Sequence, residues 1–384
     1  MRRGSESFRQ HAVCASCIRF VFPSLLAAAL ICAAGCKRQP PPATAQIRAV
    51  TRELVFAARI ATGGRAEVGM RPEYAPRQPG KPQALATDQI YITVPLTRAG
   101  LPDRTAYDAI EKELARVAEF HHLRRVARSG TPGMERFDYM LDGRRTQSIH
   151  LITPLAAAVS VRSASRRPRL AIVIDDLGSD RAQADALFRL TFPLTLSVLP
   201  HLPDSEEIAE EAHRRGYQVL LHLPMASTGG EKDEPIELHP GMDSSTVRQT
   251  FAAMLDTVPY AAGVNNHEGS LGTSDRTLMN ELMPLLRERN LFFVDSRTTA
   301  ATVAEAAAHE AGVPATSRNV FLDDETSPGA IRKQFALAVH NAREKGSALA
   351  IGHPHPETLQ VLADMLPDIE RQGITLVFAS DLAR

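Results

Sequence analysis

The sequence predicts an α/β protein whose larger part is a β/α barrel of seven to eight strands, preceded by a small α+β domain. After residue 170, short apolar runs alternate with helical stretches, which is typical of parallel strands covered on both faces. Eight such units over roughly 210 residues fit a barrel better than an open sheet, although periodicity does not exclude the open sheet. Between residues 85 and 154 the pattern is mixed, which indicates a separate small domain.

The first 36 residues have the organisation of a secretory signal. Several arginines precede an apolar run over 20–31, and the tetrapeptide Ala33-Ala34-Gly35-Cys36 follows. This tetrapeptide resembles a bacterial lipobox, in which Cys36 is lipidated and becomes the first residue of the mature chain. We therefore expect a lipoprotein signal peptide over 1–35 and a protein anchored through Cys36 on the periplasmic side of the cell envelope. Lys37 resembles the outer-membrane sorting pattern; a plain signal peptide or an uncleaved anchor is the alternative.

Residues 36–84 read as a Pro- and Gly-rich tether. Apolar residues at helical spacing predict a short amphipathic helix over 46–61, and the Gly/Pro-rich stretch 63–83 predicts a linker. Residues 85–160 then form the small α+β domain. The segment "QIYITVPL" predicts a strand, "DRTAYDAIEKELARVAEF" a helix, and Asp142-Gly143 the turn of a β-hairpin. A polar linker over 160–169 leads to the barrel, and the sequence identifies no protein partner for the small domain.

The barrel region, 170–384, carries the clearest pattern. Its helices have end signals: Asp204 and Glu207 predict a capping box, Gly216 ends that helix, and Ser274 begins another. Strands are predicted at 171–174, 194–199, 218–223, 261–265, 291–294, 320–322, 348–351 and 374–378.

Composition excludes several functions. The 44 basic and 44 acidic residues cancel, and no basic run is interleaved with aromatics, so nucleic acid is not an expected partner. Tryptophan is absent, which counts mildly against a tight polysaccharide binder. All four cysteines lie within the first 36 residues, so the barrel has no thiolates for a structural metal site and no disulfides.

Polar residues follow most of the predicted strands. One of them at a strand end is commonly a turn or a structural hydrogen bond, and Asp175-Asp176 alone would be ordinary turn chemistry. Several converging on the carboxyl-terminal rim of one barrel predict a functional site. In chain order the strand ends supply Asp175 and Asp176, His222, His267 and Glu268, Asp295, Asp323 and Asp324, and His353 and His355.

Asp and His together favour a divalent transition metal, most simply zinc with an open coordination position. One carboxylate and two imidazoles would hold the ion. The second carboxylate of the Asp175-Asp176 pair would then be free to act as a base. This division of labour explains why two like charges would stand side by side at the end of a buried strand.

From Leu170 onward the chain resembles the divergent polysaccharide deacetylase family, a branch of the NodB-type carbohydrate esterases. The matching segments are "IDDLG", "LLHLPM", "GVNNHEGS", "FVDSRT", "FLDD" and "IGHPHPETL". The resemblance implies a NodB-like barrel and metal-dependent removal of N-acetyl groups from a polysaccharide, with peptidoglycan the obvious periplasmic candidate.

The resemblance also implies residue roles. Asp176 and His222 would be metal ligands and Asp175 the general base, while His353 would be the general acid, oriented by Asp295 or Asp323. The chain departs from the family pattern at Ala226, where a second histidine is usual, at Leu177, and where an Arg-Pro-Pro segment is usual. His267 is therefore assigned here as the third ligand in place of the missing histidine.

Two other functions compete with the deacetylase. The Ala226 departure, the lack of tryptophan and the extra domain favour a glycan-binding or scaffold lipoprotein that keeps the metal pocket without turnover. Another metal hydrolase, such as a phosphoesterase, is the third hypothesis, but no Lys or Arg cluster near the motifs is suited to phosphate.

Overall fold

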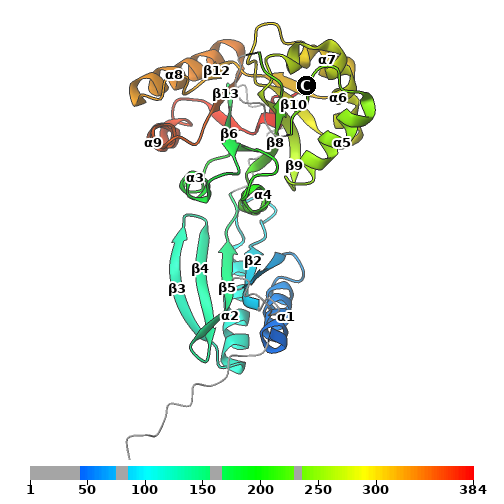
Figure 1. Cartoon of the computed structure of the whole chain (residues 1–384). Helices are drawn as coiled ribbons and strands as arrows, with labels where there is room; N and C mark the ends of the chain where they lie inside the picture. Colours follow the sequence, from blue (N-terminus) through cyan, green and yellow to red (C-terminus); the bar gives the residue numbers. More distant parts are fainter. Residues whose placement is uncertain (1–43, 75–84, 156–166, 229–235) are drawn as a thin grey trace, which may run out of the picture. The chain divides into compact units, whose positions relative to one another are not determined.

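The computed structural model describes residues 44–74, 85–155, 167–228 and 236–384, which build two sheets with their helices (Figure 1). The predicted signal peptide, the Cys36 anchor, the four cysteines and most of the 160–169 linker lie outside these residues. No helix within the described ranges is both long enough and apolar enough to span a bilayer.

The smaller sheet has five strands in the order β1-β2-β5-β4-β3, with β2 and β5 parallel and the other pairs antiparallel. Two helices pack against each other and share one apolar core with the sheet. The elements are α1 (Thr44–Ala61), β1 (Glu67–Tyr74), β2 (Leu85–Thr93), α2 (Arg104–Phe120), β3 (Arg124–Thr131), β4 (Met134–Leu141) and β5 (Arg144–Ile152).

The predicted hairpin of this domain is confirmed, because Asp142 and Gly143 link β4 to β5 with positive φ angles of 51° and 76°. One other expectation is wrong, because part of the predicted 63–83 linker is strand β1, which pairs with β2. Strand β3, which pairs with β4, was not predicted. The predicted tether helix is α1, and its buried face, including Val50 and Leu54, belongs to the core of this domain.

The larger sheet is parallel and curled, as the sequence predicted for an α/β fold of this type. Its order is β11-β10-β9-β8-β7-β6-β13-β12, and β14 pairs with the beginning of β6. Within the described residues no ladder joins β11 to β12, so the predicted barrel has the form of an open, curled half-barrel. Its strands are β6 (Arg169–Leu177), β7 (Thr195–Val198), β8 (Gln218–Met225), β9 (Ala261–Glu268), β10 (Phe292–Asp295), β11 (Ala315–Ser317), β12 (Val320–Phe321), β13 (Ser347–Gly352) and β14 (Thr375–Val377).

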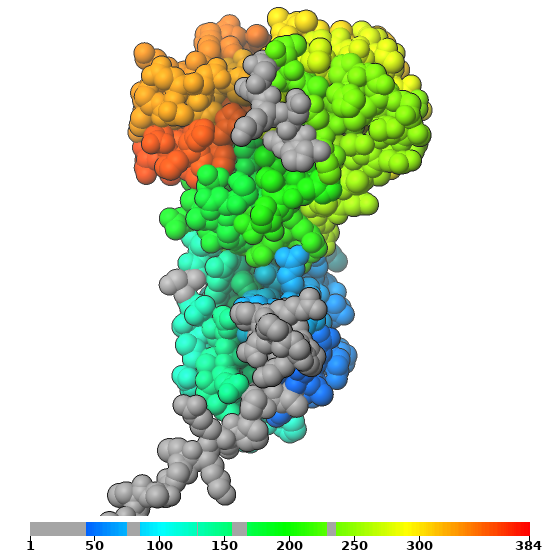
Figure 2. All heavy atoms as spheres, in the orientation of Figure 1, coloured from blue at the N-terminus to red at the C-terminus, as the bar shows by residue number. Residues whose placement is uncertain are grey.

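Helices cover the outer face of this sheet. Side chains of α8 (orange) and of α5 to α7 (green to yellow) form much of the surface in the space-filling view (Figure 2). The helices are α3 (Arg181–Leu187), α4 (Ser205–Arg215), α5 (Ser244–Leu255), α6 (Arg276–Glu288), α7 (Ala304–Glu310), α8 (Pro328–Lys345) and α9 (Pro356–Met365), with single 3₁₀ turns at Gly272–Ser274, Leu366–Asp368 and Ala379–Asp381.

Both faces of the strands are buried, which accounts for their continuous apolar runs. Along β6, Leu170 and Ile172 join the core beneath the helices, whereas Ala171 and Val173 join a smaller cluster on the other face. The eight predicted strands of this region are all present, and β11 is an additional one.

Helix ends match the sequence signals in part. Gly216 ends α4 with φ 87°, as predicted. Asp204 precedes α4 but makes no side-chain capping bond, so the predicted capping box is wrong. The cap of α6 is Asp275 rather than Ser274, because the Asp275 carboxylate accepts a hydrogen bond from the backbone N–H of Leu278.

Candidate metal centre

The carboxyl-terminal end of β6 contains a β-bulge at the two adjacent aspartates. Ile174 pairs with Leu196 of β7, but the next paired residue is Leu177, and Asp176 has a left-handed φ of 58°. In a regular strand, adjacent side chains point to opposite faces. The bulge changes this direction, so both Asp175 and Asp176 line one pocket.

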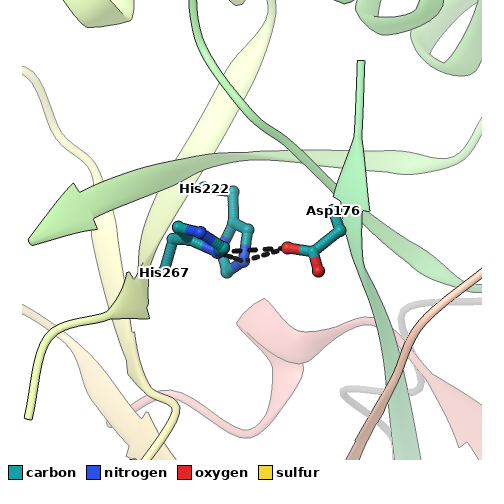
Figure 3. Close-up of side chains that lie close together, drawn as sticks. All are labelled: Asp176, His222 and His267. Atoms are coloured by element: carbon teal, nitrogen blue, oxygen red, sulfur yellow. Dashed lines mark hydrogen bonds and ion pairs between the residues drawn. The ribbon is translucent and has the colours of Figure 1, made fainter. Parts of the chain in front are cut away.

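Asp176, His222 and His267 converge in this pocket (Figure 3). Asp176 and His267 come from the ends of β6 and β9, and His222 comes from within β8. In the β8–β9 ladder His222 is paired with Asn265, two residues before His267. Residues two apart share a face, so the two imidazoles lie on the same side of the sheet. The structure thus brings together the three ligands predicted from the sequence.

The three side chains form a nearly equilateral triangle of potential ligand atoms. Asp176 Oδ1 lies 3.1 Å from His222 Nε2 and 3.1 Å from His267 Nδ1, and the two ring nitrogens are also 3.1 Å apart. Atoms that share one tetrahedral zinc ion at bonds of ~2.1 Å lie about 3.4 Å apart. The spacing therefore suits a single small divalent cation.

The charges in the triangle also favour a cation. Asp176 Oδ1 is buried and lies at ion-pair distance from the ring nitrogens of His222 and His267, but it makes no hydrogen bond of regular geometry within the described residues. Burial alone would raise the pKa of Asp176, but the adjacent His222 and His267 outweigh it and hold that pKa well below its usual range. Burial likewise opposes the charged form of His222, yet the neighbouring Asp175 and Asp176 raise its pKa. The site thus attracts positive charge, which a divalent ion would supply without a proton.

Asp175 lies beside the triangle and is only 2% exposed. Asn265 Nδ2 donates to both of its carboxylate oxygens, at 2.9 and 3.1 Å, and His222 Nε2 lies 3.7 Å from Oδ2. Burial raises the pKa of Asp175, although His222 opposes the shift. A carboxylate held next to the ligands, but with a raised proton affinity, has the character of a base.

His353 approaches the same pocket from the loop after β13. Its Nδ1 lies 2.9 Å from Asp323 Oδ1, and its Nε2 lies 3.9 Å from Asp176 Oδ2. Burial alone would lower the pKa of His353, but the hydrogen bond and charge of Asp323 outweigh it and raise the pKa to about 9. His353 therefore carries a proton at neutral pH in the same pocket as Asp175.

Asp323, rather than Asp295, contacts His353. Asp295 accepts hydrogen bonds from the Arg297 backbone N–H at 2.8 Å and from Thr302 Oγ1 at 2.9 Å, which orders the loop after β10. The sequence left both aspartates open as the orienting residue, and the expectation for Asp295 is wrong.

Asp323, His353 and His355 are a second group with metal-ligand chemistry, their potential ligand atoms lying within 4.8 Å of one another. The oxygens of Asp323 already accept hydrogen bonds from the backbone and ring of His353 and from Thr358. This group is therefore better suited to holding a proton than to holding an ion.

The pocket has a volume of about 460 Å³, and sequence reasoning missed most of its rim. Hydroxyl side chains dominate that rim: Ser227, Thr228, Ser270, Ser296, Thr298 and Thr299. Phe321 is its aromatic residue, and its ring is stacked on that of His353 with centroids 6.2 Å apart. Ala226 is buried in the loop after β8, and its methyl side chain has no atom that could bind a metal. Its backbone is hydrogen-bonded to Leu238, Leu271 and Gly272.

Comparisons with known proteins agree with this architecture. A family model described as divergent polysaccharide deacetylase matches residues 172–383. The uncharacterized protein YibQ of Escherichia coli is 40% identical over 231 residues, covering 60% of this chain and 72% of YibQ. An uncharacterized protein of Haemophilus influenzae is 39% identical over 216 residues, covering 56% of this chain and 77% of that protein.

A solved structure also matches the half-barrel. The crystal structure of an uncharacterized protein of Agrobacterium tumefaciens superposes with a TM-score of 0.55 at 22% identity. The match covers 57% of this chain and 91% of that one, and it shows a shared fold.

Proposed function

Because this chain belongs to the divergent polysaccharide deacetylase family, we propose that it is a metal-dependent hydrolase that removes N-acetyl groups from an envelope polysaccharide. The observation that carries the proposal is the triangle of Asp176, His222 and His267, with the carboxylate of Asp175 and the imidazole of His353 in the same pocket. Amide hydrolysis needs both a proton acceptor and a proton donor beside the reacting carbon.

In this proposal Asp176, His222 and His267 hold a divalent ion, most simply zinc. When bound, the ion activates water and polarises the acetyl carbonyl. Asp175 accepts the proton of the attacking water at its carboxylate. His353 then donates its Nε2 proton to the departing sugar amine as the C–N bond breaks, leaving acetate and a free amine. Asp323 keeps His353 protonated until that step.

The rim of the pocket supports a sugar substrate. Serine and threonine hydroxyls donate and accept hydrogen bonds, as sugar hydroxyls do, and they form most of the polar lining. Phe321 offers one apolar surface for a sugar ring. An N-acetylated glycan of the peptidoglycan type fits these groups, whereas the lining residues within the described ranges include no Lys or Arg that would favour a phosphoester.

Two measurements on one preparation test the proposal. Metal-free protein is titrated with Zn²⁺, and the loaded protein is then assayed for acetate release from an N-acetylated glycan and from a phosphoester panel. We expect stoichiometric binding and acetate release, both lost on chelation. Metal binding with phosphate release and no acetate would contradict the deacetylase.

A second candidate function is a glycan-binding lipoprotein that retains the metal pocket. Ala226 favours it, because the position where the family usually has a histidine cannot coordinate an ion. Binding of the glycan with no acetate release over long incubation would support this alternative and exclude the first.

We also propose that the protein is lipid-anchored at the periplasmic face of the envelope. The supporting observation is the Ala33-Ala34-Gly35-Cys36 junction after an apolar run. A palmitate analogue should label wild-type protein in cells and leave Cys36→Ser unlabelled; equal labelling of both would contradict the anchor.

A further inference from the structure

Asn265 lies inside β9 and is fully buried, directly between the predicted base and one predicted metal ligand. A polar amide at the centre of an apolar strand is costly unless it is hydrogen-bonded. Here all of its hydrogen-bonding capacity is used: Oδ1 is in contact with Ser197 Oγ and His222 Nδ1, and Nδ2 with Asp175 and Ser296 Oγ.

The hydrogen-bond partners of Asn265 determine which way its side-chain oxygen and nitrogen point. Asn265 contacts both carboxylate oxygens of Asp175, and at least one of these oxygens can only accept a hydrogen bond, so the side of Asn265 that faces Asp175 must be the NH₂ group. The carbonyl oxygen must then face His222 Nδ1, 3.0 Å away. An oxygen there accepts only, so His222 Nδ1 must carry the hydrogen.

The hydrogen on Nδ1 of His222 determines whether Nε2 of the same ring can bind a metal. In a neutral imidazole only one nitrogen carries hydrogen, so a hydrogen on Nδ1 leaves the lone pair on Nε2. Nε2 is the atom that lies 3.1 Å from both Asp176 Oδ1 and His267 Nδ1. The amide thus selects the tautomer that directs a lone pair into the triangle.

We infer that Asn265 is a positioning residue for both halves of the site: its oxygen fixes the metal-binding tautomer of His222, and its nitrogen holds Asp175 beside the ligands. The inference rests on the function proposed above and adds to it a residue outside the ligand set. Because the two roles use different atoms of one side chain, substitutions can separate them.

Two substitutions make that separation. Asn265→Ala removes both contacts and should weaken Zn²⁺ binding by about 10–100-fold, the usual loss when the partner of a metal-bound histidine is removed. Asn265→Asp keeps an oxygen facing His222 but removes the donor facing Asp175. It should bind Zn²⁺ within about threefold of wild type while kcat falls about 100-fold with KM little changed, because the base is misplaced.

The experiment is an isothermal titration of Zn²⁺ into the metal-free full chain, followed by acetate-release kinetics. Asn319→Ala is the matched control, since Asn319 Oδ1 accepts a hydrogen bond from the backbone of Leu349 in the same sheet but lies outside the pocket. The control should bind Zn²⁺ as wild type does. If Asn265→Ala does not give a cooperative melt, Asn265→Leu replaces it, because it removes the same oxygen and nitrogen while leaving no cavity in the strand.

The outcomes are distinguishable. Wild type that binds Zn²⁺, with Asn265→Ala or its replacement binding equally well, would overturn this inference and leave the proposed function standing. Asn265→Asp that loses Zn²⁺ affinity as fully as Asn265→Ala would overturn the two-atom division. Wild type that binds no divalent metal would overturn the proposed function, and this inference with it.

Discussion

Two histidine–carboxylate clusters meet in one pocket, and they differ in what holds the inner nitrogen of the histidine. In the metal cluster (Asp176, His222 and His267), Nδ1 of His222 faces the neutral amide oxygen of Asn265. In the acid cluster (Asp323, His353 and Thr358), Nδ1 of His353 faces a carboxylate at 2.9 Å.

This difference separates two uses of the same side chain. A carboxylate partner adds negative charge beside the ring and stabilises the imidazolium, so His353 keeps a proton. An amide partner fixes the tautomer without adding charge, so Nε2 of His222 can be a ligand once a cation enters. Residue type alone therefore does not distinguish ligand from acid; the surroundings of both ring nitrogens do.

The largest expected effect separates the two aspartates of β6. Asp176→Asn should abolish measurable Zn²⁺ binding, because it removes the carboxylate that balances the cation in the triangle. Asp175→Asn should bind nearly as well as wild type, since its proposed task is proton transfer. Isothermal titration of both variants checks this order, and equal binding by both would contradict the ligand assignment.

A second substitution tests the acid cluster. His353→Gln should lower the rate of acetate release by about 10²–10⁴-fold, the usual contribution of a positioned general acid. Its Zn²⁺ affinity should change little, because His353 is not one of the three side chains that form the triangle of potential ligand atoms. A large loss of Zn²⁺ affinity with little loss of turnover would reverse the roles of the two clusters.

The carboxylate partner of His353 predicts a pH dependence. With a pKa of about 9, His353 is protonated below that value, so turnover should fall as pH rises through about 9. Asp323→Asn removes the largest cause of the raised pKa, so the same fall should move toward the ordinary histidine range of ~6.5. Measuring the rate of acetate release against pH for wild type and Asp323→Asn tests this. Asp295→Asn is the control, and its rate should fall over the same pH range as that of wild type.

The smallest expected effect concerns Thr358. Its hydroxyl donates to Asp323 Oδ2 at 2.7 Å, and Thr358→Val removes this hydrogen bond at nearly constant volume. Asp323 keeps its two bonds to His353, so turnover at neutral pH should fall only severalfold, corresponding to ~1 kcal/mol. Loss of folding, or a loss as large as that of His353→Gln, would show that Thr358 does more than support Asp323.

The strand ends were readable from the sequence because each apolar run stops at a polar residue, and parallel strands bring those stops to one edge. This pattern predicted that several Asp and His side chains would meet at one rim, whereas the choice of Asp176, His222 and His267 as ligands also relied on the resemblance to the family. It could not choose between Asp295 and Asp323, since both follow a strand, and only the pairing of β12 with β13 brings one of them to His353.

Other features depend on contacts that periodicity does not encode. Strand β1 contains Gly69 and Pro72 and lies at a sheet edge, so it has linker composition although it pairs along its length with β2. Asn265 was overlooked because an amide within a strand has no motif of its own. The available signal was the pair of asparagines in an apolar strand, where unsatisfied amides would be costly.

The bulge in β6 has a consequence for how such chains change over generations. The two carboxylates face one pocket because one strand contains one more residue than its neighbour requires. A single-codon deletion on either side could restore a regular ladder while leaving both aspartates in the gene, and it would turn one of them away. Descendants could therefore keep both aspartates and still lose the site. The number of residues in the bulge is thus as important for the site as the identity of the two aspartates.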